Sequence, residues 1–175
     1  MTIYQALYIA IGIYVPLLGA TAYITRPNRR RFLGALAGGV TVAVVGVGIE
    51  TLAHTLGFWR YPSVEQPYGP FALYPLVVAV FTMIALIGWR VLRRFGWRGQ
   101  IIFLALLTTL GVLRDFLIAE QVLGIIVFAR GIAIVVVDGA IWTGTVALAL
   151  AVMRLVAGPA GADPLGHRLW SFRAS

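Results

Sequence analysis

Four ionisable residues lie inside long apolar stretches of the chain, where a charge is expensive and usually serves a function. They are Glu50, Arg114, Asp115 and Asp138. At about 1.5 Å of rise per residue, the three carboxylates fall at similar depths on three different helices. This shared layer predicts a site for acid–base chemistry on a lipophilic substrate in the outer half of the membrane.

Glu50 and His54 are four residues apart, so they share one face of a helix. The same face continues inward through Gly46 and Gly39, whose small size favours close approach of a neighbouring helix. The pair is a candidate acid and base at the bottom of an outward-opening pocket. Alternatively, the two side chains only satisfy polar groups on adjacent helices and hold the bundle together.

Asp115 shares a small-residue stripe with Gly111, whereas Arg114 is rotated from it by about 100°. Asp115 is therefore a candidate catalytic residue. Arg114 is a candidate substrate-binding residue, but a structural role is an equal alternative. In that role it would pair with Glu50 or Asp138 on another helix, or extend to the outer interface.

Asp138, Trp142 and Thr145 follow spacings of four and three and form one helix face. Desolvation beside an indole disfavours the charged form of a carboxyl group, which makes Asp138 a candidate general acid and Trp142 a candidate substrate-binding residue. The alternative is a structural hydrogen bond from Asp138 to a neighbouring helix or to Arg130.

Composition excludes several chemistries. The 175 residues include fourteen basic residues, all of them arginine, and no cysteine. A lysine Schiff base, a phosphate-loop lysine, disulfides, thiolate catalysis, cysteine-ligated zinc and iron–sulfur clusters are therefore impossible. Two histidines without clustered carboxylates give little basis for a metal site, so we expect no metal and no cofactor.

Five apolar stretches are long enough to cross a bilayer, which needs about 20 residues per helix. We expect an all-α membrane bundle of five transmembrane helices forming one domain over residues 1–157, followed by a short tail over 158–175. The predicted spans are Tyr4–Thr25, Phe32–Trp59, Phe71–Leu92, Ile101–Ala119 and Gly131–Ala157.

The arginines predict the orientation of these spans, because short loops rich in arginine stay in the cytoplasm. Eleven arginines fall on one side of the predicted bundle and three on the other. We therefore expect a multi-pass protein of the cell membrane with its N-terminus outside and its C-terminus cytoplasmic. Membrane lipids are the expected partners and nucleic acid is not, while a homo-oligomer or a membrane complex stays open.

Two connecting segments carry further expectations. The turn-rich stretch 57–70 contains Trp59 and Tyr61, which are candidate substrate-binding residues, and it is either an interfacial anchor or a substrate collar, with the anchor favoured. The stretch 120–130 is too apolar for a plain solvated loop. It predicts an interfacial helix or an extra turn of the fifth span.

The segment Gly57-Phe58-Trp59-Arg60-Tyr61-Pro62, following Glu50 on a membrane span, resembles small integral-membrane carotenoid and terpenoid cyclases of the lycopene cyclase type. That resemblance implies a cofactor-poor membrane enzyme that protonates an isoprenoid and guides a carbocation. The paired-glutamate motif after a proline, which that family carries near a span end, is missing here.

Two classes of function follow. The first is a membrane enzyme for acid-initiated cyclisation or isomerisation of an isoprenoid-type lipid. The second is a non-catalytic lipid- or pigment-binding subunit, or a small proton-coupled carrier.

Overall fold

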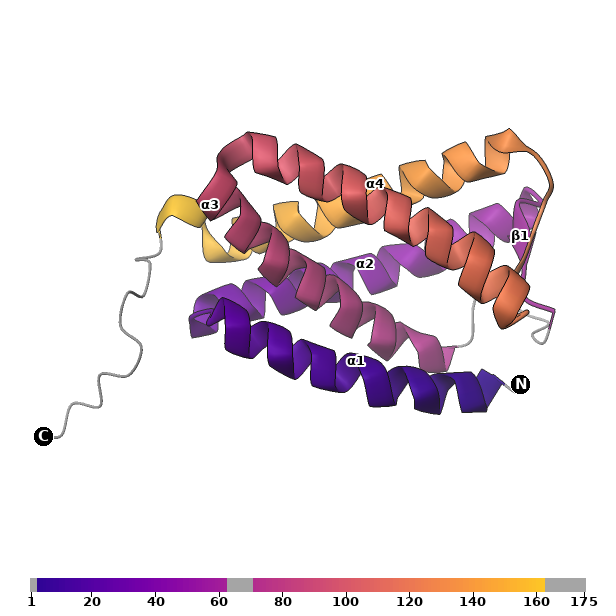
Figure 1. Cartoon of the computed structure of the whole chain (residues 1–175), viewed down its shortest axis with the longest axis horizontal. Coiled ribbons are helices and arrows are strands. Elements are labelled where there is room, and N and C mark those ends of the chain that lie inside the picture. Colours follow the sequence, from indigo (N-terminus) through magenta and orange to yellow (C-terminus); the bar gives the residue numbers. More distant parts are fainter. Residues whose placement is uncertain (1–2, 63–70, 163–175) are drawn as a thin grey trace, which may run out of the picture.

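The computed structural model describes residues 3–62 and 71–162, and these form an almost entirely helical bundle (Figure 1). In the described residues four helices are long and apolar enough to cross a membrane. The elements are α1 (Ile3–Thr25), α2 (Arg29–Thr55), β1 (Trp59–Arg60), a 3-10 turn (Phe71–Leu73), α3 (Tyr74–Leu113), a π-helix (Arg114–Val122), β2 (Val127–Phe128), α4 (Ile132–Ala157) and a second 3-10 turn (Ala160–Ala162).

Helices α2, α3 and α4 pack against one another, while α1 packs mainly against α3 (Figure 1). Small residues on α2 permit this close packing, as their spacing predicts. A Cβ atom at Gly38 would lie 2.5 Å from the Ala149 carbonyl oxygen on α4, and one at Gly39 would lie 2.5 Å from the Val78 carbonyl oxygen on α3. Glycine at these two positions therefore lets two helix backbones approach α2 at once.

Helix α3 reverses direction at Gly96, where φ is 65° and ψ is −160°. Positive φ is readily adopted only by glycine, so this residue allows two helical arms to meet in a sharp turn. Figure 1 shows the arms running back along each other. Gly88 of the first arm lies against Phe103 of the second. The predicted third and fourth spans thus correspond to the two arms of one bent element.

The segment 120–130 differs from its prediction. It is neither an interfacial helix nor an extra turn of the last span. Glu120–Val122 finish the π-helix, and Val127–Phe128 form β2, which pairs antiparallel with β1 in the register Trp59↔Phe128 and Arg60↔Val127. Its apolar residues Ile126 and Phe128 belong to a buried hydrophobic cluster that also includes Trp59. The segment is therefore apolar because it packs between the ends of the helices.

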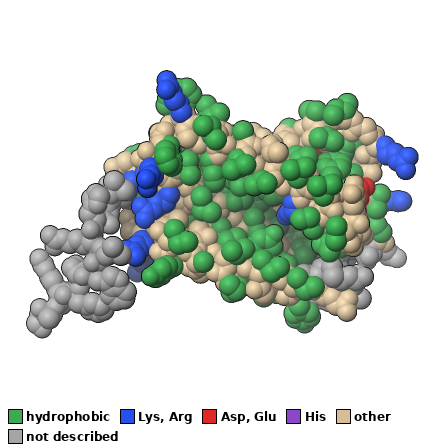
Figure 2. All heavy atoms as spheres, in the orientation of Figure 1, with side chains coloured by type: hydrophobic (Ala, Val, Ile, Leu, Met, Phe, Trp, Pro, Cys, Tyr) green, Lys and Arg blue, Asp and Glu red, His purple; other side chains and the backbone are tan. Residues whose placement is uncertain are grey.

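The surface is apolar around the middle of the bundle, and arginine side chains gather at one end of it (Figure 2). Large hydrophobic residues such as Val44, Ile102 and Ile132 point outward. An exposed apolar belt of this extent is what a lipid-facing surface requires, and it is incompatible with a water-facing one. The chain therefore has the architecture of an all-α membrane protein. Most of the predicted tail, from residue 163 onward, lies outside the described residues.

Candidate functional site

Asp115 stands at the start of the π-helix with both carboxylate oxygens bonded. Its Oδ1 accepts from the Nε of Arg114 at 2.8 Å and from the terminal guanidinium nitrogen of the same residue. Its Oδ2 accepts from the indole Nε1–H of Trp142 on α4 at 2.8 Å. Only 8% of Asp115 is exposed, so these donors replace the water that the carboxylate has lost.

Three residues contact the indole ring of Trp142. Its indole lies directly on Gly111, where a Cβ atom would overlap the ring. It stacks on Phe81 with ring centroids 5.8 Å apart, and the guanidinium of Arg114 lies 5.2 Å from its centroid. The small-residue stripe that contains Gly111 and Asp115 therefore lies against α4, and Trp142 is an aromatic wall beside Asp115.

Asp138 lies on α4 one turn before Trp142, and 4% of it is exposed. Its Oδ2 is buried and has no hydrogen-bond partner among the described residues. The predicted structural bond to Arg130 is not formed. Asp138 lies within electrostatic range of Asp115 and Arg114. Two neighbouring carboxyl groups therefore occupy different environments, one fully bonded and one with an unused oxygen.

Glu50 on α2 meets two phenols. The hydroxyl of Tyr74 donates to its Oε2 at 3.4 Å, and the Tyr61 phenol lies within electrostatic range of it. Burial, followed by the charge of Glu50, raises the pKa of the Tyr61 phenol well above its ordinary value. Asp115 makes a smaller contribution to the same effect, so Tyr61 lies within electrostatic range of both carboxyl groups.

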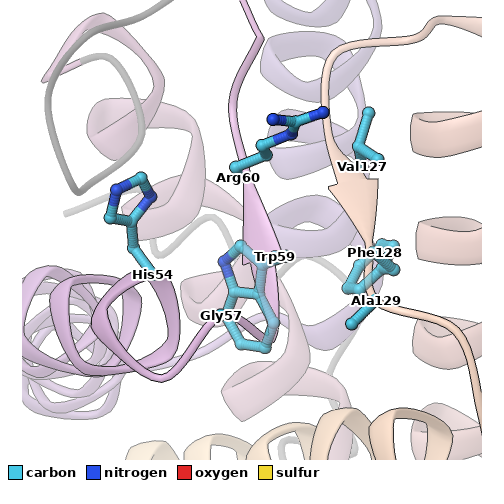
Figure 3. Close-up of a pocket in the computed structure, with 7 residues that line it drawn as sticks. All are labelled: His54, Gly57, Trp59, Arg60, Val127, Phe128 and Ala129. Carbon is cyan, nitrogen blue, oxygen red and sulfur yellow. The ribbon is translucent and has the colours of Figure 1, made fainter.

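His54 faces a different cavity from the one predicted. Its imidazole lines a pocket of about 320 Å³ at the β1–β2 end of the bundle, together with Gly57, Trp59, Arg60, Val127, Phe128 and Ala129 (Figure 3). Its Nδ1 is buried without a partner among the described residues. The Glu50–His54 acid–base pair stays a prediction, while the structure places Tyr74 against Glu50 and places His54 with Trp59 in the lining of this pocket.

The pairing expected for Arg114 is wrong. Its guanidinium bonds the adjacent Asp115, and not Glu50 or Asp138 on another helix. The side chain is 46% exposed on the isolated bundle and curves back over Trp142. The rotation of about 100° between Arg114 and Asp115 on the helix does not predict this contact. Trp59, a second candidate substrate-binding residue, packs edge-on against Phe128 instead of reaching the carboxylate layer.

Sequence reasoning missed two contributors to this region. Tyr74 is not among the candidate site residues predicted from the sequence, yet its hydroxyl donates to Glu50. Phe81 is apolar, so its sequence position does not mark it as a site residue. Its stacking on Trp142 in the structure identifies it. Glu120 lies outside the layer, where its Oε1 accepts the backbone N–H of Phe128 at 3.1 Å.

The carboxylates share a layer without converging on one point. Across residues 3–62 and 71–162, no three His, Asp or Glu side chains are grouped closely enough to hold a metal ion. What the arrangement offers is a set of titratable groups within electrostatic range of one another, in which Tyr61 is influenced by Glu50 and Asp115, and Asp138 by Asp115. No family model, curated protein or solved structure matches the chain.

Proposed function

We propose that this protein is a membrane enzyme that binds a lipophilic substrate at the Asp115–Trp142–Asp138 layer and acts on it by cofactor-independent acid–base chemistry. The observation that carries the proposal is the contrast between two neighbouring carboxyl groups. Asp115 has N–H donors on both oxygens, whereas Asp138 has a buried oxygen without a partner among the described residues. Environments that separate two carboxyl groups are the usual basis for dividing the roles of acid and base.

In the concrete form of the proposal, Asp138 donates a proton to a carbon–carbon double bond of an isoprenoid-type lipid. The double bond supplies the electron pair for the new C–H bond and leaves a carbocation. The face of Trp142 and the carboxylate of Asp115 stabilise that cation. Loss of a proton from a neighbouring carbon to Asp115 or Glu50 then forms a new double bond, giving isomerisation. Cyclisation results where a second double bond of the same lipid first donates its electron pair to the cation, which forms a new C–C bond and moves the positive charge before the proton is lost. The isoprenoid class is supported by the sequence resemblance at residues 57–62.

The proposal includes five membrane crossings, with the two arms of α3 crossing separately. The N-terminus would lie outside the cell membrane and the C-terminus in the cytoplasm. Arginines at the Gly96 turn, including Arg94 and Arg98, and at the start of α2 support this orientation, because arginine-rich loops remain cytoplasmic. The carboxylate layer would then lie in the outer half of the bilayer.

A second candidate is a proton-coupled carrier. The specific observation in its favour is that Tyr61 lies within electrostatic range of both Glu50 and Asp115, while Tyr74 hydrogen-bonds Glu50. A phenol between two carboxyl groups can pass a proton by accepting at its oxygen and donating its own hydrogen. In that case the same layer would conduct protons, and lipid conversion would be absent.

Neutral substitutions test the enzyme proposal. Lipids that co-purify with the full chain are identified by mass spectrometry and followed for conversion by wild type and by Glu50→Gln, Asp115→Asn and Asp138→Asn. We expect Asp138→Asn to fold normally, because its Oδ2 has no bond to lose, and to stop turnover. Glu120→Gln is the matched control, since this carboxylate lies outside the layer, and it should retain turnover.

Full activity in all three layer variants would overturn the enzyme proposal, as would loss of activity through misfolding alone. The carrier is tested in proteoliposomes with an imposed pH gradient. Proton flux that depends on Glu50 and Tyr61, without any change in lipid, would favour the second candidate.

A further inference from the structure

The pocket at the β1–β2 end of the bundle is separate from the carboxylate layer and has its own chemistry. It encloses about 320 Å³ between the end of α2, the strand β1 and the strand β2 (Figure 3). Its walls combine apolar surface from Val127, Phe128 and Ala129 with polar side chains. Small-molecule sites commonly have this composition, with apolar walls and a few polar groups that fix the ligand.

All three polar side chains of the lining can donate hydrogen bonds. They are His54, Trp59 and Arg60, and no acidic residue is among the described residues that line the pocket. Trp59 is only 7% exposed, and its Nε1–H has no partner among the described residues. The indole nitrogen can only donate, so this buried group lacks an acceptor. Such a group calls for a ligand or a water molecule that supplies one.

The donors are held by a stiff frame. The antiparallel pairs Trp59↔Phe128 and Arg60↔Val127 hold the backbone of β1 against β2. The Trp59 ring meets Phe128 edge-on, with centroids 5.7 Å apart at 61°. Backbone hydrogen bonds of 2.8 Å tie Phe58 to Ala53 and Ala129 to Phe58. A ligand therefore meets donors that are already positioned and loses little affinity to their ordering.

We propose that this pocket binds a phosphate group. A guanidinium, an indole N–H and an imidazole N–H together match the several acceptor oxygens of a phosphate ester, and arginine is well suited to this anion. The apolar walls and the volume leave room for the carbon atoms of an ester beside the phosphate. The source is either a phospholipid headgroup or free inorganic phosphate. The inference does not depend on the proposed acid–base function.

Figure 3 shows the relation between the donors. The nitrogen-bearing edge of Trp59 is turned toward His54, while the guanidinium of Arg60 on the same strand is turned toward Val127. His54 Nδ1 is also buried without a partner among the described residues. Two partnerless nitrogen atoms from separate elements, lining one pocket with an arginine, distinguish this site from a general basic surface.

The test uses the full chain in detergent micelles and three probes. Phosphatidate and a diacylglycerol with the same acyl chains are compared by native mass spectrometry, and inorganic phosphate is titrated calorimetrically. The variants are Arg60→Gln, which removes the charge, and Trp59→Phe, which keeps an aromatic ring but removes the N–H. Arg130→Gln is the matched control, because Arg130 is an exposed arginine that does not line the pocket.

We expect wild type to prefer phosphatidate over diacylglycerol, and each pocket variant to weaken phosphatidate binding by about tenfold while Arg130→Gln does not. That result assigns the site to a phospholipid headgroup. Inorganic phosphate binding that is lost in the same two variants, without a preference between the lipids, also supports the site and assigns it to the free anion. If wild type shows no preference for phosphatidate over diacylglycerol and does not bind inorganic phosphate, the proposal is wrong. Equal losses in Arg130→Gln and Arg60→Gln would overturn it too.

Discussion

The indole Nε1–H of Trp142 on α4 donates a 2.8 Å hydrogen bond to Oδ2 of Asp115 at the start of the π-helix. This bond explains how a tryptophan and a carboxylate can both be buried among apolar helices. The indole supplies the hydrogen-bond donor, and the carboxylate supplies the acceptor, that water would otherwise provide. It also ties α4 to the second arm of α3 at the level of Asp138. The geometry of the proposed site therefore depends on it.

Trp142→Phe should lower stability while leaving the ring packing intact. The substitution removes the donor to Asp115, and a hydrogen bond to a charged group contributes about 1.5–3 kcal/mol. Phenylalanine can still stack on Phe81. Thermal unfolding in detergent, followed by circular dichroism, measures the loss. Trp97→Phe is the control, because Trp97 is 66% exposed, and it should unfold like wild type. An equal change in both variants would remove the special role of Trp142.

Gly111→Ala should separate the second arm of α3 from α4. Its Cβ atom would overlap the Trp142 ring, so either the indole shifts or the helices move apart, at a cost of about 1–3 kcal/mol. Gly144→Ala is the matched change, since no atom lies within 4 Å of the added methyl group. Alanine favours the helix there, so we expect equal or slightly higher stability. If both variants behave alike in thermal unfolding, Gly111 is not needed for close packing.

The helical class and the site's main helix faces could be predicted from the sequence because they follow from local periodicity. Long apolar runs identify the helices, and the spacing of Gly111 and Asp115 identifies the face that packs on α4. The reversal at Gly96 was also anticipated as a break between apolar stretches. Each of these predictions uses only the position of a residue on its own helix.

The errors arose where side-chain reach or contacts between distant segments decide the outcome. For Arg114 the sequence leaves open a partner across the bundle or an extension to the interface, yet its long flexible side chain curves back to the adjacent Asp115. The segment 120–130 was expected to be helical because it is apolar. In the structure part of it pairs with β1, a contact between residues about 70 positions apart that periodicity does not encode.

Tyr61 should make stability fall at alkaline pH. Burial and Glu50 raise the pKa of its phenol above the ordinary value of about 10, so the unfolded chain releases this proton at lower pH than the folded chain. The stabilising contribution is then complete below about pH 10 and declines as the pH rises further. Tyr61→Phe should show a smaller alkaline loss in thermal unfolding than wild type. Tyr8→Phe, at an exposed position, should keep the wild-type slope. Matching slopes in wild type and Tyr61→Phe would contradict the prediction.

Single cysteines can test the five crossings, because the natural chain has none to interfere. Trp97→Cys places a thiol at the Gly96 turn, whereas Thr55→Cys and Gln121→Cys place one at the far end of α2 and of the π-helix, all at exposed positions. If the two arms of α3 cross separately, a membrane-impermeant maleimide added to intact cells should label positions 55 and 121 and leave 97 unlabelled until the membrane is opened. Labelling of all three from outside would mean that the Gly96 turn does not reach the cytoplasm. Because the reversal at Gly96 places position 97 at the opposite end of the bundle from the carboxylate layer, that outcome would also remove the basis for assigning the layer to the outer half of the bilayer.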